Sequence, residues 1–197
     1  MLAENLDGHG RYRLLEPVRQ FAQAQLAAGA EQDAVYRRHA AYFLSLAEQM
    51  GEARDTLREQ ALLQTLEPER ANLRAVNSWA IAQGESEFAH HFNGALFAFW
   101  IYRSSAAEAR HWMEAVLELK AAVPTPATLT AEAQALDAAG YIAVLHHDAV
   151  QAQRWFEREL NIYTAMNHLP GIAAALRGCG FTALLRGDLA QAQHDTE

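Results

Sequence analysis

The sequence predicts an all-α protein built as a solenoid of stacked helical hairpins. One observation behind this prediction is an internal repeat, because GYIAVLHHDAVQA at 140–152 returns forty residues later as GFTALLRGDLAQA at 180–192. A period near forty residues is typical of helical hairpins that bury their apolar faces by stacking. The other is helix-favouring composition, since alanine and arginine are common and glycines and prolines divide the chain into segments of helical length.

The part of the chain before the repeat predicts a short strand followed by helices. Polar and apolar residues alternate at 11–15, as in a short strand, and Pro17 fits the first turn of a helix that runs to Gly29. A helix is expected at 32–50, because its apolar residues recur at spacings of three and four and share one face. That face comprises Tyr36, Ala40, Phe43, Ala47 and Met50. Further helices are expected at 55–66, from Pro68 to Gly84, from Ser86 and from Ser105.

Two signals define helix boundaries more sharply. Ser105 and Glu108 fit a capping box, in which each side chain accepts a hydrogen bond from a backbone N–H of the first turn. The proline-rich stretch at 123–126 predicts a stiff, extended connection between two regions. Beyond it, helices are expected at 130–146, 149–165, 171–186 and from 189 onward.

The repeated glycines indicate close contact between helices. Gly140 and Gly180 fall inside expected helices, where glycine costs about 1 kcal/mol relative to alanine, so close helix packing is the expected compensation. Ala152 and Ala192 are the small residues expected on the facing helices. Asp148 and Asp188 are expected to cap the second helix of each hairpin.

These positions resemble the tetratricopeptide repeat in a slightly longer form. The matching residues are Leu136, Gly140, Ala152 and Phe156 in one unit, and Leu176, Gly180, Gly187 and Ala192 in the next. A degenerate third unit lies upstream, where 109–114 parallels 152–157 and Phe97 occupies the glycine position. The resemblance implies a right-handed superhelix whose concave face binds a partner.

A second resemblance covers essentially the whole chain. Three segments resemble, in this order, the middle of bacterial STAND-class predicted ATPases related to LuxR-type and AfsR-like transcriptional regulators. They are RYRLLEPVRQFA at 11–22, YRRHAAYF at 36–43 and LEPERANLRA at 66–75. The resemblance implies that 1–28 ends a winged-helix-like segment, that 29–122 forms helical hairpins with one degenerate repeat, and that 127–197 forms two tetratricopeptide-like repeats. The last of these repeats is truncated, so further repeats or a second copy of the chain are expected to cover its open end.

Composition and missing motifs limit the chemistry expected of the chain. No phosphate-binding loop is present, so ATP is expected only on a domain outside these residues, and the chain is expected to be non-enzymatic and free of cofactors. The paired histidines at 90–91 and 146–147 lack the spacing and the cysteine neighbours of a metal site. A net charge of -8 weighs against nucleic acid as the main partner, and the absence of a long apolar run favours a cytoplasmic protein without membrane contact.

The candidate binding residues lie on the first helix of each hairpin, which lines the concave face of a solenoid. They are Gln134, Asp137, Tyr141 and Val144 in one unit and Arg177, Phe181 and Leu184 in the next, with His91 and Tyr102 as weaker upstream candidates. Aromatic, acidic and basic groups together suit a protein partner, a peptide or a small-molecule effector.

The function expected from these residues and resemblances is that of a sensor or scaffold region in a multidomain transcriptional regulator. Binding on the helical-repeat surface would be relayed to the regulator's own ATPase core. One alternative is a winged-helix DNA-binding module, in which Arg11, Arg13 and Arg19 contact phosphate, although direct DNA contact is not expected at this net charge. The other alternative is a free-standing tetratricopeptide adaptor.

Overall fold

The chain is almost entirely helical, as the sequence predicts. The computed structural model describes residues 2–6, 9–54 and 56–188, with side chains from Leu14 onward. The chain folds as two compact units, Met1–Ala41 and Tyr42–Glu197. Within the described residues, every helix is too short or too polar to cross a membrane.

The first unit contains a β-hairpin and a helix. Strands β1 (Leu2–Leu6) and β2 (His9–Arg13) pair antiparallel, with Leu2 opposite Arg13, and α1 (Glu16–Ala28) follows. The strand expected at 11–15 is therefore the second half of a hairpin and ends two residues earlier. Pro17 lies in the first turn of α1, where its missing N–H costs no hydrogen bond. Helix α2 (Gln32–Glu52) begins in this unit and continues into the second.

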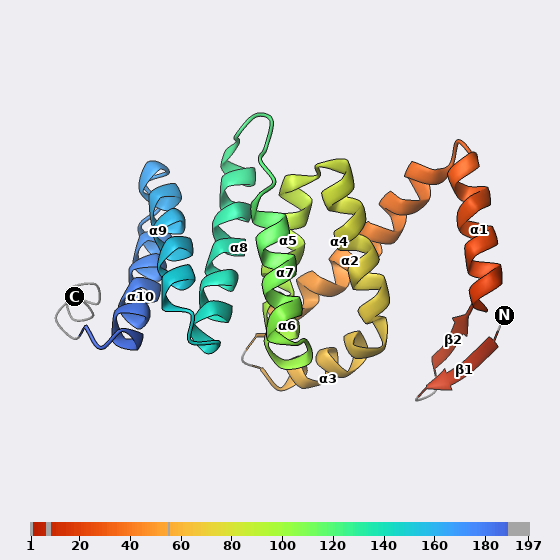
Figure 1. Cartoon of the computed structure of the whole chain (residues 1–197), viewed down its shortest axis with the longest axis horizontal. Coiled ribbons are helices and arrows are strands. Elements are labelled where there is room, and N and C mark those ends of the chain that lie inside the picture. Colours follow the sequence, from red (N-terminus) through yellow and green to blue (C-terminus); the bar gives the residue numbers. More distant parts are fainter. Residues whose placement is uncertain (1, 7–8, 55, 189–197) are drawn as a thin grey trace. The chain divides into compact units, whose positions relative to one another are not determined.

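The second unit is a series of helices that pack on their sequence neighbours. Its remaining elements are α3 (Leu57–Leu66), the 3-10 helix η1 (Glu67–Glu69), α4 (Arg70–Gln83), α5 (Ser86–Ala95), α6 (Phe97–Arg103), α7 (Ala106–Leu117), α8 (Pro126–Leu145), α9 (Ala149–Ala165) and α10 (Leu169–Leu185). Helix α8 packs against α5 and α7 as well as against α9 and α10, so it is shared by successive layers (Figure 1). This arrangement confirms the predicted stack of helical hairpins.

Most of the predicted helix boundaries agree with the structure to within two residues. Helix α9 matches its expected range, and in α2 the predicted stripe is buried at Phe43, Ala47 and Met50. The helix expected from residue 189 onward lies outside the described residues.

The connection expected at 123–126 ends one residue earlier than predicted, because α8 begins at Pro126. Thr125 is the N-cap residue, and its hydroxyl accepts a hydrogen bond from the Thr128 N–H at 3.2 Å. The Thr128 hydroxyl in turn accepts from the Thr125 N–H at 2.8 Å. This reciprocal capping box lets the proline serve as a first-turn residue rather than as part of an extended linker.

The repeat is visible in the backbone as a turn that recurs every twenty residues. His147, Asn167 and Gly187 have φ angles of 58°, 52° and 77°, in the left-handed region. In each turn the backbone N–H of the residue after the left-handed one donates to the carbonyl five residues before it. The distances are 2.9 Å for Asp148 to Ala143, 3.0 Å for His168 to Tyr163 and 3.0 Å for Asp188 to Ala183. These bonds satisfy carbonyls that the helix C-terminus leaves without partners.

The residue after each turn caps the helix that follows. A carboxylate oxygen of Asp148 accepts from the Gln151 N–H at 3.1 Å, which confirms its predicted capping role. His168 does the same through Nδ1, which accepts from the Gly171 N–H at 3.0 Å. The helix that Asp188 is expected to cap begins outside the described residues.

An aromatic ring, rather than Ala152, occupies the space that Gly140 leaves open. A methyl group placed on Gly140 would lie 2.5 Å from the ring of Phe156, and one placed on Gly178 of α10 would approach the same ring even more closely. Phe156 is fully buried. Ala152 is also buried on α9, but the atoms nearest to Gly140 belong to Phe156. The glycine is therefore needed for close packing, as predicted, with a different partner.

The degenerate upstream unit differs from the following unit near Phe97, the residue at the glycine position of the repeat. Where the next unit has the single helix α8, this unit has α5 and α6, which are separated at Leu96. Phe97, which occupies the glycine position, is the first residue of α6. Close approach is provided instead by Gly94, where an added methyl group would lie 3.4 Å from the backbone of Gln134 and Ala135 in α8.

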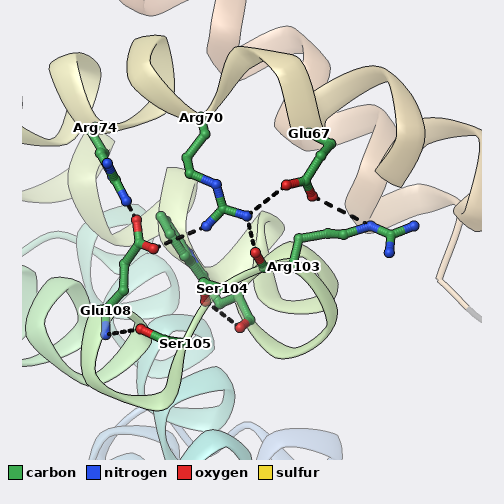
Figure 2. A network of polar contacts seen from close by, with 8 residues as sticks. Glu67, Arg70, Arg74, Arg103, Ser104, Ser105 and Glu108 are labelled. Carbon is green, nitrogen blue, oxygen red and sulfur yellow. Dashed lines mark hydrogen bonds and ion pairs between the residues drawn. The ribbon is translucent and has the colours of Figure 1, made fainter.

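A network of charged residues joins η1, helix α4 and the start of α7 (Figure 2). Glu108 accepts from Arg74 Nε at 2.8 Å and from Arg70 Nη1 at 3.0 Å. Arg70 also donates to Glu67 at 2.8 Å and to the backbone carbonyl of Arg103. Glu67, Arg70 and Arg74 belong to the motif at 66–75, so the structure gives that motif a role in packing.

This network changes the capping box predicted at the start of α7. The Ser105 hydroxyl accepts from the Glu108 N–H at 3.2 Å, as expected. The Glu108 carboxylate binds the two arginines instead of the Ser105 N–H, since a charged guanidinium is a stronger donor than a neutral amide. Only half of the predicted box is formed. Hydrogen bonding to Arg74 is the main cause of the lowered pKa of Glu108.

We expect Gly140→Ala to destabilise the protein by roughly 1–3 kcal/mol, because the new methyl group would overlap the Phe156 ring. Gly51→Ala is the matched control. A methyl group there would meet Ala95 at an ordinary 3.6–3.7 Å, so the gain in helix propensity should leave stability unchanged or raised. Chemical denaturation measures both free energies of unfolding. Equal effects of the two substitutions would contradict the close-packing account.

We expect Glu108→Gln to cost roughly 1–3 kcal/mol at pH 7, because it leaves Arg70 and Arg74 without their shared carboxylate. The lowered pKa of Glu108 means that its contribution is present above the ordinary carboxylate pKa and is lost as pH falls through the folded value. The difference from the unmodified chain should therefore shrink in acid. Glu114→Gln, on the exposed face of the same helix, should have little effect at either pH.

Candidate functional site

A pocket of about 480 Å³ lies among five helices of the second unit. Its lining comes from α2 and the residues after it, α5, α8, α9 and α10, and so from segments far apart in the sequence. The lining residues are Glu48, Gly51, Glu52, Arg54, His91, Gly94, Ala95, Gln134, Asp137, Glu159, Tyr163, Ala174 and Arg177. This volume is in the range of about 300–1,000 Å³ that is usual for small-molecule sites.

Two carboxylates in this pocket are short of hydrogen-bond donors. Glu159 is 1% exposed, and its Oε2 atom accepts no hydrogen bond from the described residues. Asp137 is half-buried, and its buried Oδ1 atom is likewise without a donor among them. A buried carboxylate without a donor costs free energy, and such atoms are uncommon in folded proteins.

Burial changes the protonation of both groups. Loss of solvent raises the pKa of Glu159 to about 8, with a further rise from the nearby charge of Asp137 and a smaller opposing effect from Arg177. Loss of solvent also raises the pKa of Asp137, against the attraction of Arg54 and Arg177. Glu159 is therefore mostly protonated at neutral pH, whereas an ordinary glutamate is ionised.

The two arginines of the pocket already have partners. Arg177 Nε donates to the Tyr141 hydroxyl at 3.1 Å. The guanidinium of Arg54 lies over the Phe97 ring, 4.4 Å from its centroid. Phe97 and Tyr141 in turn meet edge to face, with centroids 6.3 Å apart. Both cations oppose the rise in the pKa of Asp137 that burial causes, and Arg177 does the same for Glu159.

The site also has a polar edge formed by α2 and α5. His91 Nε2 lies 3.1 Å from Glu48 Oε1, and both side chains are partly exposed. Glu52, also on α2, is another lining residue. This side therefore adds carboxylates to a pocket that already contains Asp137 and Glu159.

The structure brings several predicted site residues together. Gln134, Asp137, Arg177 and the weaker candidate His91 line the pocket, and Tyr141 holds Arg177 by the hydrogen bond described above.

The other predicted site residues lie outside the pocket lining. Phe181 contacts Tyr141 edge to face at 6.0 Å, while Val144 is half-buried and Leu184 is 50% exposed. Tyr102 lies in a separate cleft with Glu67 and Arg103. A binding role for these residues stays a prediction.

Sequence reasoning missed Glu159, Tyr163 and Arg54. Glu159 had a detectable signal, because it continues the buried stripe of Ala152, Trp155, Phe156 and Tyr163 at helical spacing. An acidic residue on an apolar stripe is a candidate for function. Arg54 follows α2 in a connection, and the sequence alone contains no comparable signal for its position.

Two observations in the described part of the chain bear on the metal and DNA alternatives, while the side chains of Arg11 and Arg13 lie outside it. No group of three or more His, Cys, Asp and Glu side chains there is placed to hold a metal ion. In the first unit Arg19 pairs with Glu16 and Arg37 pairs with Asp33, so these cations already face acidic neighbours.

Comparison with known proteins links the chain to bacterial regulators. A segment of 118 residues, 60% of this chain, is 33% identical to proteins of Mycobacterium bovis and Mycobacterium tuberculosis that are named HTH-type transcriptional regulators. The matched segment spans only 13% of the length of each relative. No family model matches the chain. The names of these relatives agree with the transcriptional-regulator part of the resemblance noted in the sequence.

The raised pKa of Glu159 predicts a stability difference that depends on pH. The folded state binds a proton that the unfolded state releases between pH 4.5 and about 8, so this contribution is full below pH 4.5 and declines as pH rises to about 8. Glu159→Gln, which stays neutral, should therefore be more stable than the unmodified chain at pH 8, and the difference should shrink towards pH 5. Denaturation at several pH values tests this.

The comparison between variants isolates Glu159 from other titrating groups. Buried His90, whose pKa is lowered chiefly by loss of solvent, contributes in the opposite direction but is present in both proteins. Glu157→Gln, on the exposed face of the same helix, is the matched control and should follow the unmodified chain. A parallel curve for Glu159→Gln would refute the assignment of the pH dependence to Glu159.

Proposed function

We propose that this chain is the sensor region of a multidomain transcriptional regulator and that its pocket binds an effector. The observation that carries the proposal is the pocket itself, in which Glu159 is buried without a hydrogen-bond donor in a site lined by five helices. A group with this burial and pKa, in a concave site, is more typical of a binding site than of a packing core. The regulatory relatives supply the broader context.

The proposed mechanism is a shift between two packings of the helical stack. The pocket is lined by α2 and α5 on one part of its surface and by α10 on another, so an effector that contacts all of them favours the arrangement in which they surround it. A nucleotide-binding domain outside these residues would read this shift. The chain itself would perform no catalysis and would hold no cofactor.

A protein or peptide partner on the same helices is the nearest variant of this proposal. Exposed aromatic and aliphatic side chains of α10, Phe181 and Leu184, would extend the contact surface for such a partner. Direct DNA binding has weaker support, given the net charge of -8 and the paired Arg19 and Arg37.

The test is a transcriptional reporter controlled by the regulator that carries this segment. Tyr141→Ala combined with Arg177→Glu removes the hydrogen bond beside the pocket and reverses one charge in its lining. We expect the response to change by at least roughly fivefold, the low end of allosteric coupling. Arg154→Glu makes the same charge change on an exposed part of α9 and should leave the response intact.

Immunoblotting and thermal denaturation show whether the double variant is folded. An unchanged response from a folded double variant would exclude the pocket as the sensing site. Salt-dependent binding of duplex DNA by the chain, lost on Arg19→Glu, would instead favour the DNA-binding alternative.

A further inference from the structure

The pocket contains acceptors that need donors. Glu159 Oε2 and Asp137 Oδ1 are both buried without a hydrogen-bond partner among the described residues, and both side chains line the same pocket. Glu159 is 1% exposed, so solvent reaches it only slightly. A ligand that satisfies these two atoms has to bring hydrogen-bond donors.

We propose that the pocket binds a small organic amine, whose ammonium group donates hydrogen bonds to Glu159 and Asp137. This assignment rests on the proposed function, since it names the ligand class of the same pocket. An ammonium group has three donors and no acceptor, so it matches a pair of carboxylates. Its positive charge also compensates for the repulsion between Asp137 and Glu159 when both are ionised.

The charges of the pocket favour a cation over an anion. Its lining carries four acidic side chains, Glu48, Glu52, Asp137 and Glu159, against two arginines and one histidine, and a cation adds to this excess by favouring the ionised form of Glu159. Both arginines are already engaged, Arg177 with the Tyr141 hydroxyl and Arg54 with the Phe97 ring. An anionic ligand would have to compete for the arginines and would leave the two orphan carboxylate oxygens without donors.

The geometry favours an organic cation over a metal ion. The described residues contain no group of three or more metal-ligating side chains in a suitable arrangement. The pocket, at about 480 Å³, has room for an alkyl chain, and Ala95, Ala174 and the ring of Tyr163 offer it apolar contact. A bare divalent ion would use little of this space, and no three of the described His, Cys, Asp and Glu side chains are grouped to hold it.

Binding of an amine is linked to proton release. Between pH 6 and 7.5 Glu159 is largely protonated, and an ammonium group favours its ionised form, so affinity should rise by close to tenfold per pH unit in this range. About one proton per ligand should be released at pH 7. The charged or titratable groups that line the pocket with Glu159 are Asp137 from α8, Arg177 from α10, Tyr163 from α9, His91 from α5, and Glu48, Glu52 and Arg54 from α2 and the residues after it. Tyr141 of α8 is a further neighbour: burial raises its pKa most, and the charge of Glu159 adds to the rise.

The experiment is calorimetric titration of the 197-residue chain with 1,4-diaminobutane at pH 6.5, 7.5 and 8.5. Titration at pH 7 in two buffers of different ionisation enthalpy measures the released proton. Succinate, with the same number of carbons and opposite charge, is the control ligand. Nα-acetyl-lysine amide tests whether a protein lysine side chain serves as well as a free amine.

We expect 1,4-diaminobutane to bind more tightly at pH 8.5 than at pH 6.5 and succinate not to bind. Glu159→Gln should weaken binding at least tenfold and abolish proton release, while exposed Glu157→Gln should do neither. Asp137→Asn, which keeps the size of the side chain, provides a second variant with weakened binding. Tighter binding of Nα-acetyl-lysine amide than of the diamine would favour a protein ligand and overturn the small-molecule assignment.

Three other outcomes would also overturn the proposal. These are no binding of either amine at pH 8.5, equal binding of succinate, and an unchanged affinity in folded Glu159→Gln.

The reporter assay separates failure of the amine proposal from failure of the proposed function. If the pocket variants Tyr141→Ala and Arg177→Glu alter the response and amines do not bind, the ligand class is wrong and the sensor role remains. If amines bind and the response is unaffected, the sensor role is wrong.

Discussion

The position of α9 depends on the contact between one aromatic ring and two glycines. The ring of Phe156 occupies space that a side chain on Gly140 of α8 or on Gly178 of α10 would fill, so the three helices can approach only while both positions lack a side chain. Interiors pack at crystal-like density, and this contact therefore fixes the spacing of the helices as well as stabilising them. Helix α8 also packs on α5, so the same spacing is transmitted to the wall of the pocket formed by α5.

This packing also explains why a carboxylate is buried. Glu159 lies three residues after Phe156, and Tyr163 follows four residues later, so the three side chains share one face of α9. Once the Phe156 ring is seated between the glycines, that face points inward and Glu159 has very little access to bulk water. The cost of burying an ionised carboxylate is avoided by protonation, which is the physical reason for a pKa of about 8. A leucine at 159 would fit the stripe without this cost, so packing alone does not account for the glutamate.

The sequence predicted the helices and the repeat better than it predicted the pocket. Helical spacing, turn residues and the glycines at 140 and 180 are local signals, and they were sufficient for the hairpin stack and for the Asp148 cap. The partner of Gly140 could not be inferred in the same way, since ring placement depends on side-chain packing across helices. The pocket depends on tertiary contacts as well. Arg54, in a connection more than eighty residues before Asp137, is brought towards it only when α2, α5 and α8 assemble.

A pocket built in this way couples binding to the arrangement of the stack. Its lining joins α2 and α5 to α8, α9 and α10, so a ligand in contact with Glu159 and with the α2 side bridges helices that the chain connects only through several intervening elements. The packing that buries Glu159 can be stabilised in two alternative ways. Glu159 can be neutralised by protonation, or it can be ionised beside a cation. In the proposed binding, an empty pocket would hold the proton and a filled one would hold the cation. The affinity of the site is thus linked to the packing that Phe156 sets, and any change in the separation of α8 and α10 would alter both together.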